Sequence, residues 1–382
     1  SGLRIAAMDD AAMRGWMEDD RAAPSPVAIA PGDPFNIIYS SGTTGTPKGI
    51  VQGHAMRHGH VARAARFGYD ESAVTLISTP LYSNTTLVCF LPALAGGGHV
   101  VMMPKFDAPR FLELSQRHRV THAALVPVQY QRLMDLPDFG RFDLSSYRFK
   151  SSTSAPFPPA LMADVLARWP GALINIYGMT EGGGTCILQA HEYPDKLHTV
   201  GRPVEGHDIR LIGEDGREVA AGEAGEVVGH SGAMMTGYLG QPGKTREAEW
   251  HDDQGRRFIR HGDIGQFDED GFLVLIDRAK DMIISGGFNI YPSDLEAVLI
   301  AQPSVREAAV VGVPSRQWGE TPVAFAVLRE GADAQALLAA VNGKLGKTQR
   351  LHDLVPVDAL PRSAIGKVLK RELRERYGPA RG

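Results

Sequence analysis

Short apolar runs alternate with helix-compatible stretches through the first half of the chain. An initial run spans Phe35–Ser40, and the later runs are Ala73–Ser78, His99–Pro104, Thr121–Pro127 and Ala172–Gly178. The stretch Pro158–Pro170, just before the last run, is compatible with a helix. Alternation of this kind predicts a largely parallel α/β sheet.

The start of this pattern contains a glycine-rich loop. The loop separates the run at Phe35–Ser40 from Ile50–Gly68, whose residues are compatible with a helix. The expected local order is therefore strand, loop, helix. Before it, the segment Ala22–Pro34 contains four prolines, which indicates a linker.

The pattern changes twice in the second half. From Thr199 to Phe272, short strands and Asp-Gly turns replace the helices and predict a β-rich subdomain. Farther on, Ser293 and Glu296 have capping-box spacing at the start of a short helix. Strand-like runs, a helix around residues 334–345 and a basic helix over Gly366–Tyr377 follow, as in a small α+β domain.

We therefore expect an α/β protein with a large N-terminal domain, mostly parallel in its sheet, and a small C-terminal α+β domain. The predicted division has four parts: residues 1–34 as a linker or remnant of a preceding segment, 35–198 as an α/β core, 199–278 as a β-rich subdomain of the large domain, and 279–382 as the C-terminal domain.

Composition narrows the class of protein. The 382 residues carry a net charge of −4, which gives no general attraction to nucleic acid or to an anionic membrane. Two cysteines, Cys89 and Cys186, are too few for a disulfide framework and lack metal-ligand spacing. The first residues do not resemble a signal peptide, and the longest apolar stretch is interrupted by Pro and Gly. We expect a cytoplasmic protein without a membrane span.

The glycine-rich loop, Tyr39–Gly49, reads YSSGTTGTPKG. It does not match the kinase and GTPase P-loop, because Lys48 is preceded by Pro47 and followed by Gly49 instead of standing between a glycine and a hydroxyl residue. Its hydroxyls, backbone amides and single cation still suit polyphosphate oxygens. A surface turn rich in Ser, Gly and Thr is the alternative interpretation.

A second motif, Asn175–Gly184, groups an aromatic ring, a hydroxyl and a carboxylate at the end of a strand. Tyr177 could stack a base, Thr180 could hold a phosphate, and Glu181 could ligate Mg²⁺. A structural tyrosine and a solvated turn glutamate are the alternative.

Two further motifs carry isolated charges. Asp263 and Arg278 flank a predicted hairpin, from which they could face one ligand, with the carboxylate accepting the two hydroxyls of a ribose. Lys367 opens the predicted basic helix. Taken singly, such charges more often belong to surface pairs or solvated faces.

Together and in this order, the four motifs resemble those of the superfamily of acyl-CoA synthetases, nonribosomal-peptide adenylation domains and firefly luciferase. The resemblance runs from about Phe35 to Tyr377 and is closest to acyl- and aryl-CoA ligases of the 4-coumarate and fatty-acid kind. It implies a reaction in two halves. A carboxylic acid and Mg·ATP form an acyl-adenylate and pyrophosphate, and the thiol of coenzyme A then displaces AMP to form a thioester.

The resemblance also implies roles for individual residues. Lys367, Thr180, Glu181 and Arg278 are the expected catalytic residues, with Glu181 as the Mg²⁺ ligand. Nucleotide and coenzyme A contacts are expected from Ser40, Ser41, Gly42, Thr43, Thr44, Gly45, Lys48, Ser154, Ala155, Pro156, Tyr177, Gly178, Asp263, Gly286 and Gly287. Lys280 matches the hinge about which the C-terminal domain is mobile in such enzymes, and that motion withdraws the lysine corresponding to Lys367 after the first half-reaction.

The sequence departs from the family pattern at the acyl pocket and near the start. Ser83, between Tyr82 and Asn84, replaces a histidine common in relatives, and Gly182 and Gly183 are expected to leave room there for a bulky aryl or medium- to long-chain acyl group. His261 stands where threonine is common. The phosphate loop begins about forty residues into the chain, where relatives carry a further domain-sized segment before it.

Three functions follow as hypotheses. The first is a carboxylate–CoA ligase, whose partners are a small carboxylic acid and coenzyme A, with a homodimer left open. The second is an adenylating module that loads a separate carrier protein. The third is an inactive nucleotide-binding fragment, which the short N-terminal segment suggests.

Overall fold

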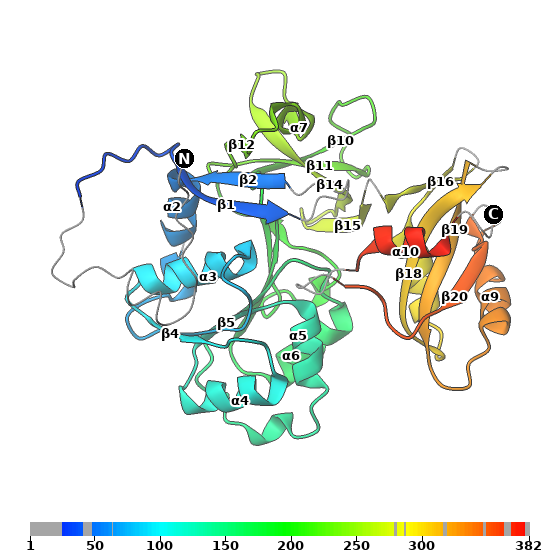
Figure 1. Ribbon diagram of the computed structural model, residues 1–382, viewed down its shortest axis with the longest axis horizontal. Coiled ribbons are helices and arrows are strands. Elements are labelled where there is room, and N and C mark those ends of the chain that lie inside the picture. The colour runs from blue at the N-terminus through cyan, green and yellow to red at the C-terminus, as the bar shows by residue number, and fades with distance from the viewer. Residues whose placement is uncertain are drawn as a thin grey trace, which may run out of the picture.

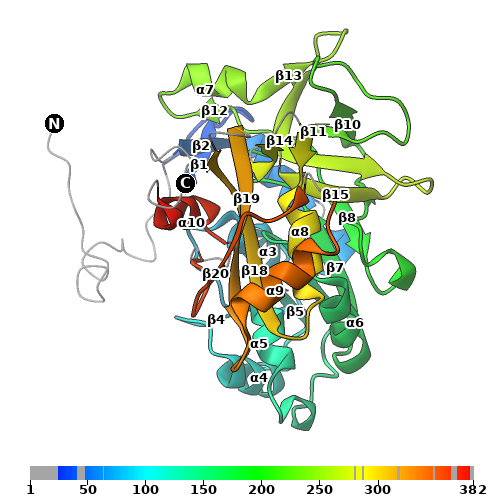
Figure 2. The same cartoon turned by 90° about the vertical axis from the view of Figure 1, so that its right-hand side faces the viewer.

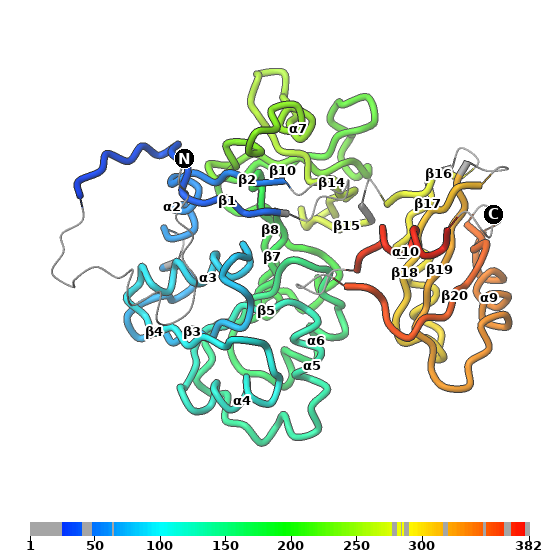
Figure 3. Tube along the Cα trace, in the orientation of Figure 1, coloured from blue at the N-terminus to red at the C-terminus, as the bar shows by residue number. Residues whose placement is uncertain are grey.

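The computed structural model describes residues 25–40, 48–62, 64–278, 281–285, 288–315, 319–346, 349–362 and 368–378. Figure 1 shows a large N-terminal body and, beyond β15 (Leu273–Arg278), a smaller C-terminal unit. Figure 3 shows β16 (Ile283–Ser285) within the smaller unit. In the part of the chain so described, no helix has the length and apolar character needed to cross a bilayer.

A seven-stranded sheet forms the centre of the body. Its order is β4-β3-β5-β6-β7-β8-β9, and the strands from β4 to β7 are parallel, as predicted from the alternation of apolar runs. The bounds are β3 Val74–Ile77, β4 His99–Met102, β5 His122–Leu125, β6 Phe149–Ser152, β7 Ala172–Tyr177, β8 Cys186–Gln189 and β9 Arg202–Pro203. Because β3 to β7 run in one direction, their carboxyl ends share one edge, where ligands of α/β sheets bind.

Helices cover both faces of this sheet. One apolar cluster joins Ala123 and Leu125 of β5 to α4 (Ala108–Arg117), α5 (Pro127–Met134) and α6 (Pro159–Arg168). The alternate residue Ala124 packs instead with Cys89 of α3 (Asn84–Ala95). Successive strand side chains point to opposite faces, so α3 lies opposite the other three helices.

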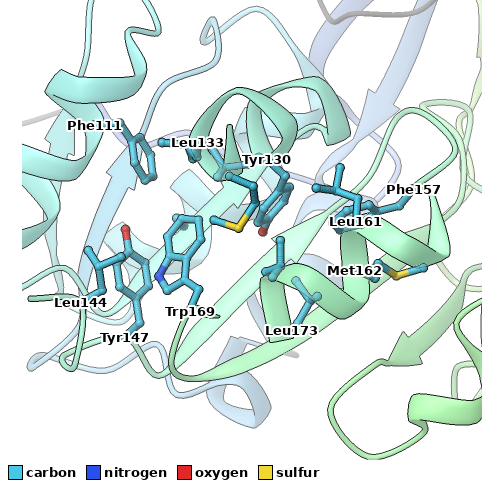
Figure 4. Close-up of a cluster of buried hydrophobic side chains, with 14 of the residues drawn as sticks. Phe111, Tyr130, Leu133, Leu144, Tyr147, Phe157, Leu161, Met162, Trp169 and Leu173 are labelled. Carbon is cyan, nitrogen blue, oxygen red and sulfur yellow. The ribbon is translucent and has the colours of Figure 1, made fainter. Parts of the chain in front are cut away.

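Trp169 anchors the larger cluster. The fully buried indole lies between Tyr147 and Tyr130, as Figure 4 shows, with ring centroids 5.0 and 5.9 Å away. After Trp169, the chain turns under Lys150 of β6, which is itself fully buried and donates from Nζ to the carbonyls of Trp169, Pro170 and Gly171. These contacts fix the α6–β7 turn and therefore the position of β7.

The glycine-rich loop does not lie between a strand and a helix, so that prediction was wrong. Residues 41–47 connect β1 (Pro34–Ser40) to a second strand, β2 (Lys48–Gly53), which pairs with β1 antiparallel. With β12 (Gly237–Tyr238) these strands form a separate three-stranded sheet. The helix α2 (His54–Ala62) begins only after β2, whose residues Ile50, Gln52 and Gly53 were expected to be helical.

A five-stranded sheet forms the β-rich part. Its order is β10-β11-β14-β13, with β15 also paired to β14, and the bounds are β10 Asp208–Ile212, β11 Gly225–His230, β13 Glu249–His251, α7 Pro242–Glu247 and β14 Arg257–Phe267. The predicted Asp-Gly turns are confirmed at Gly216 and Gly271, which have φ of 76° and 78°.

The C-terminal unit has three layers. Its sheet has the order β17-β16-β19-β18, with β20 beside β19, and Figure 2 shows α8 and α9 in front of it. The bounds are β17 Phe288–Ile290, α8 Pro292–Ile300, β18 Val305–Ser315, β19 Gly319–Leu328, α9 Ala334–Asn342, β20 Asp353–Pro356 and α10 Lys370–Tyr377. Helices α8 and α9 pack on one face, and α10 packs on the other through Leu373 and Tyr377.

Two local predictions for this unit were wrong. Ser293 and Glu296 form no capping box: Ser293 donates to the carbonyl of Ile276 in β15, and Glu296 accepts from the backbone of Val310 and pairs with Lys370. Both side chains are therefore engaged in tertiary contacts. The last helix begins at Lys370 and not at Gly366.

Candidate active site

Tyr177 and Asp263 meet across two sheets. Tyr177 ends β7, and its hydroxyl donates to Asp263 Oδ2 at 2.8 Å from β14. His261 lies two residues before Asp263 in β14, and its Nδ1 is 3.1 Å from the same Tyr177 hydroxyl. Asp263 and His261 are 8% and 6% exposed. The structure thus joins two predicted nucleotide residues and adds a histidine for which the sequence suggested no role.

Asp263 also faces Arg278 in backbone register, as expected for a hairpin. The Cα atoms of the two residues are direct partners in the antiparallel β14–β15 ladder, so the predicted hairpin is confirmed. The ladder places both residues beside β7 through the Tyr177 contact.

Glu181 follows in the turn after β7 and is held by Tyr238. The Tyr238 hydroxyl donates to Glu181 Oε1 at 2.9 Å, and Lys48 Nζ lies 4.7 Å from the centroid of the Tyr238 ring. Burial, and then the nearby carboxylate of Glu181, raise the pKa of Tyr238 well above its ordinary value, so the hydroxyl keeps its proton. A cation over an aromatic face is favourable. Tyr238 therefore links Lys48, near the end of the glycine-rich loop, to the predicted Mg²⁺ ligand.

A buried polar network links Thr180 to the β1–β2 hairpin. Gln52 of β2 donates from Nε2 to the Thr180 carbonyl at 2.7 Å, and its Oε1 accepts from Arg57 of α2 and from Asn36 of β1. Gln52 and Arg57 are 0% and 3% exposed. Burial lowers the pKa of Arg57 to about 10. In the described part of the chain, the partners of this guanidinium are the side-chain amides of Asn36 and Gln52 and the Nδ1 of His60 at 3.4 Å, and no ion pair with a carboxylate is found.

Ser154 lies beside the start of α3. Its hydroxyl is 2.5 Å from that of Thr85, and its backbone has φ of 77°, a left-handed conformation unusual for a residue with a side chain. Ser154, Ala155 and Pro156 form one segment of the predicted nucleotide contacts. The contact brings that segment to the predicted acyl-pocket residues Ser83 and Asn84, while Tyr82 is 73% exposed.

The glycines after Glu181 pack closely against the β-rich part of the body. A Cβ on Gly182 would lie 2.0 Å from the Ala233 carbonyl oxygen, and one on Gly184 would lie 1.7 Å from Ile209 Cδ1. Gly182 and Gly183 have φ of 79° and 87°. On the side where a Cβ would lie, these glycines make room for the protein's own β-rich part, because the turn packs directly on it.

Several predicted residues lie outside the described residues. They are Ser41, Gly42, Thr43, Thr44 and Gly45 of the loop, the hinge residue Lys280, Gly286 and Gly287, and Lys367. For Ser40 and Arg278 the backbone alone is described.

The donor set around Glu181 suits a metal carried by a nucleotide. Across the described ranges, no group of three or more His, Cys, Asp or Glu side chains could enclose a metal ion. Mg²⁺ is commonly bound through one or two carboxylates together with substrate phosphates. Glu181 is a single half-buried carboxylate, and Tyr238 links it to Lys48 of β2; this arrangement fits that manner of binding.

Comparison with known proteins agrees with this geometry. Residues 3–239 match the AMP-binding enzyme family, and residues 294–367 match the AMP-binding enzyme C-terminal domain. The chain belongs to the AMP-binding enzyme family. A feruloyl-CoA synthase from Amycolatopsis sp is 36% identical to it over 375 residues that cover 94% of this chain and 73% of that protein.

Two further similar proteins extend the comparison. The long-chain-fatty-acid–CoA ligase FadD13 of Mycobacterium tuberculosis is 34% identical over 361 residues, covering 93% of this chain and 70% of that protein. The structure of ATP-bound MatB from Rhodopseudomonas palustris superimposes with a TM-score of 0.85 at 30% identity, over 94% of this chain and 71% of that one. This chain therefore shares its α/β fold with that solved structure.

Sequence reasoning missed four residues of the site: Tyr238, His261, Gln52 and Arg57. His261 differs from the residue common at its position, which was a usable signal. Tyr238 lies in a short strand without a recognisable local motif. Gln52 and Arg57 fell in a segment assigned to a helix, so their pairing across β2 and α2 was hidden.

Proposed function

We propose that this chain is an AMP-forming acyl-CoA synthetase, which activates a carboxylic acid with ATP and transfers the acyl group to coenzyme A. The observation that carries the proposal is the grouping of Tyr177, Asp263 and Glu181 beside the carboxyl end of β7 in a member of the AMP-binding enzyme family. Two curated relatives have CoA-ligase names, which supports this choice.

The proposed reaction assigns separate tasks to these residues. In the first half, a carboxylate oxygen bonds to the α-phosphorus of ATP as the bond to pyrophosphate breaks. Tyr177 would contact adenine, Asp263 would accept the ribose hydroxyls, and Glu181 would hold Mg²⁺ with the phosphates. Lys48 and Thr180 would contact phosphate oxygens, where fixed positive charge and donors stabilise developing charge.

In the second half, the thiol sulfur of coenzyme A bonds to the acyl carbon. The bond from that carbon to the AMP oxygen breaks, and the thiol proton is released. The acid is proposed to be an aryl or a medium- to long-chain acid, because one similar protein is a feruloyl-CoA synthase and another a long-chain-fatty-acid–CoA ligase. The cytoplasm remains the proposed compartment, since Cys89 and Cys186 are free thiols.

The deciding experiment measures AMP and pyrophosphate release from ATP and Mg²⁺ against a panel of hydroxycinnamic, benzoic and fatty acids. We expect release that depends on one class of acid, and thioester only when coenzyme A is present. Release of AMP with no thioester, together with loading of a phosphopantetheine carrier, would favour the carrier-loading alternative. Binding of AMP with no turnover on any acid would favour the inactive fragment. Sedimentation of the same sample tests the homodimer.

Lys367 provides a test of the two halves separately. Lys367→Ala is expected to abolish adenylation and to retain thioester formation from a supplied acyl-adenylate, because this lysine is proposed to act on charge developing at the α-phosphate. Lys344→Ala, on the same domain, is the matched control. Equal loss of both halves in Lys367→Ala would contradict the assigned role.

A further inference from the structure

His261 contacts the same Tyr177 hydroxyl that donates to Asp263. Its imidazole is 6% exposed, and its ring centroid lies 5.3 Å from that of Tyr177 at an interplanar angle of 30°. The space that it occupies is made by two glycines. A Cβ on Gly229 would lie 2.8 Å from His261 Nε2, and one on Gly183 would lie 3.4 Å away.

The hydrogen-bond geometry fixes which atom donates. A tyrosine hydroxyl has a single hydrogen, and that of Tyr177 is directed to Asp263 Oδ2 at 2.8 Å. His261 Nδ1, 3.1 Å from the same hydroxyl oxygen, must then be the donor. The contacts form a directed series in which Nδ1–H donates to the hydroxyl and the hydroxyl donates to the carboxylate.

This series has a consequence for the nucleoside. The Tyr177 ring and the Asp263 carboxylate come from different sheets, and the Tyr177 hydroxyl joins them. Because His261 donates to the Tyr177 hydroxyl oxygen, the hydroxyl hydrogen stays directed at the Asp263 carboxylate. Such a series of hydrogen bonds also strengthens the bond between the hydroxyl and the carboxylate. Without this donor, the hydroxyl could turn and the carboxylate could rotate away from the place where it would receive ribose.

We infer that His261 is a positioning residue of the nucleotide site: through Nδ1 and the Tyr177 hydroxyl, it orients the Asp263 carboxylate for the nucleoside. The inference rests on the proposed function. It differs from a packing role, in which the imidazole would only fill the space between Gly183 and Gly229.

The test replaces His261 by two residues that differ in the donor. In His261→Asn, the side-chain amide can reach the position of Nδ1 and donate, whereas His261→Leu has similar bulk and no donor. We expect His261→Leu to raise the Kd for AMP and the KM for ATP by about 3- to 10-fold, the range of one net hydrogen bond, with kcat changed less. His261→Asn should stay within about 2-fold of the unmodified chain, which is the rescue that a donor role requires.

A double-mutant cycle separates the two roles. In the Tyr177→Phe background the hydroxyl is absent, so His261→Leu and His261→Asn should have the same affinity for AMP. Equal loss in both single variants, or a loss from His261→Leu that persists undiminished in Tyr177→Phe, would overturn the inference in favour of packing.

Folding and the proposed function are checked in the same samples. If thermal unfolding shows that His261→Leu does not fold, the comparison of His261→Asn with His261→Gln replaces it, since the longer glutamine places its amide beyond Nδ1; equal affinities would then contradict the inference. If the unmodified chain binds AMP and His261→Leu binds AMP with the same affinity, this inference is overturned and the proposed function is not. An unmodified chain that binds neither AMP nor ATP removes the proposed function, and this inference with it.

Discussion

Two tyrosine–carboxylate pairs organise the candidate site, and they are built differently. Tyr177 donates to Asp263 at 2.8 Å between β7 and β14, strands held by several ladder partners each. Tyr238 donates to Glu181 at 2.9 Å, but β12 has only two residues and Glu181 lies in a turn. The first pair is fixed by sheets, and the second joins a turn to the hairpin that carries the glycine-rich loop.

The two tyrosines also differ in the basic side chain that contacts each of them. A nearly buried histidine donates to Tyr177, whereas the cation of Lys48 faces the Tyr238 ring. Lys48 is the first described residue after residues 41–47. We infer that the Tyr177 pair is preformed for the nucleoside, and that the Tyr238 pair couples the glycine-rich loop to Glu181.

The largest effect is expected at Glu181. Glu181→Gln keeps an acceptor for Tyr238 but removes the charge that would bind Mg²⁺, so AMP release should fall by about 100-fold or more. The Mg²⁺ concentration needed for half-maximal rate should rise. Glu192→Gln, an exposed change on the next connection, is the control and should leave both unchanged. A variant at Glu181 with an unaltered Mg²⁺ dependence would refute metal binding by this carboxylate.

The next largest effect is expected for substitution of Asp263, which should weaken the affinity for AMP. Asp263→Asn can still accept from Tyr177, but it loses charge-assisted bonds to ribose hydroxyls, which we expect to weaken AMP binding by about 10- to 100-fold. Titration calorimetry with AMP and with 2′-deoxy- and 3′-deoxy-AMP measures this. The difference between the unmodified chain and the variant should shrink for a deoxynucleotide. An equal penalty for all three ligands would mean that Asp263 does not contact the ribose.

The contrast between the pairs also explains what could be predicted from sequence. Regular apolar runs predicted the parallel sheet, and the Asp263–Arg278 hairpin followed from strand and turn composition, because both depend on local patterns. The β1–β2 hairpin was missed since Gly53 and the helix-forming residues after it made β2 resemble the start of α2. Tyr238 could not be placed beside Glu181, because their contact spans 57 residues and depends on tertiary packing.

Removing the two hydroxyls compares the pairs directly. Tyr238→Phe keeps the ring beneath Lys48 and loses the bond to Glu181, so we expect kcat to fall by about 3- to 10-fold, with a raised Mg²⁺ requirement and little change in AMP affinity. Tyr177→Phe should do the opposite, weakening AMP and leaving the Mg²⁺ dependence as it was. Steady-state rates at varied Mg²⁺ and AMP titrations distinguish these outcomes. If the two variants changed AMP affinity and Mg²⁺ dependence in the same way, the Tyr177–Asp263 and Tyr238–Glu181 pairs would not have separate roles.

The smallest effect on activity is expected at Gln52, where stability and activity should separate. Gln52→Glu keeps acceptors for Arg57 and Asn36 and gives the buried guanidinium a carboxylate partner, but removes the donor to the Thr180 carbonyl. We expect unchanged or higher stability in urea and AMP release lowered by about 2- to 5-fold as the turn before Glu181 shifts.

Gln52→Met is the matched change. It leaves Arg57 and the Thr180 carbonyl buried with fewer partners, which should cost about 2–5 kcal/mol of unfolding free energy. If Gln52→Glu were as unstable as Gln52→Met, the charge of Arg57 would not be accessible to the new carboxylate. If instead Gln52→Glu were stable and fully active, the bond to Thr180 would not position the turn, and the coupling between the hairpin and Glu181 would rest on Tyr238 alone.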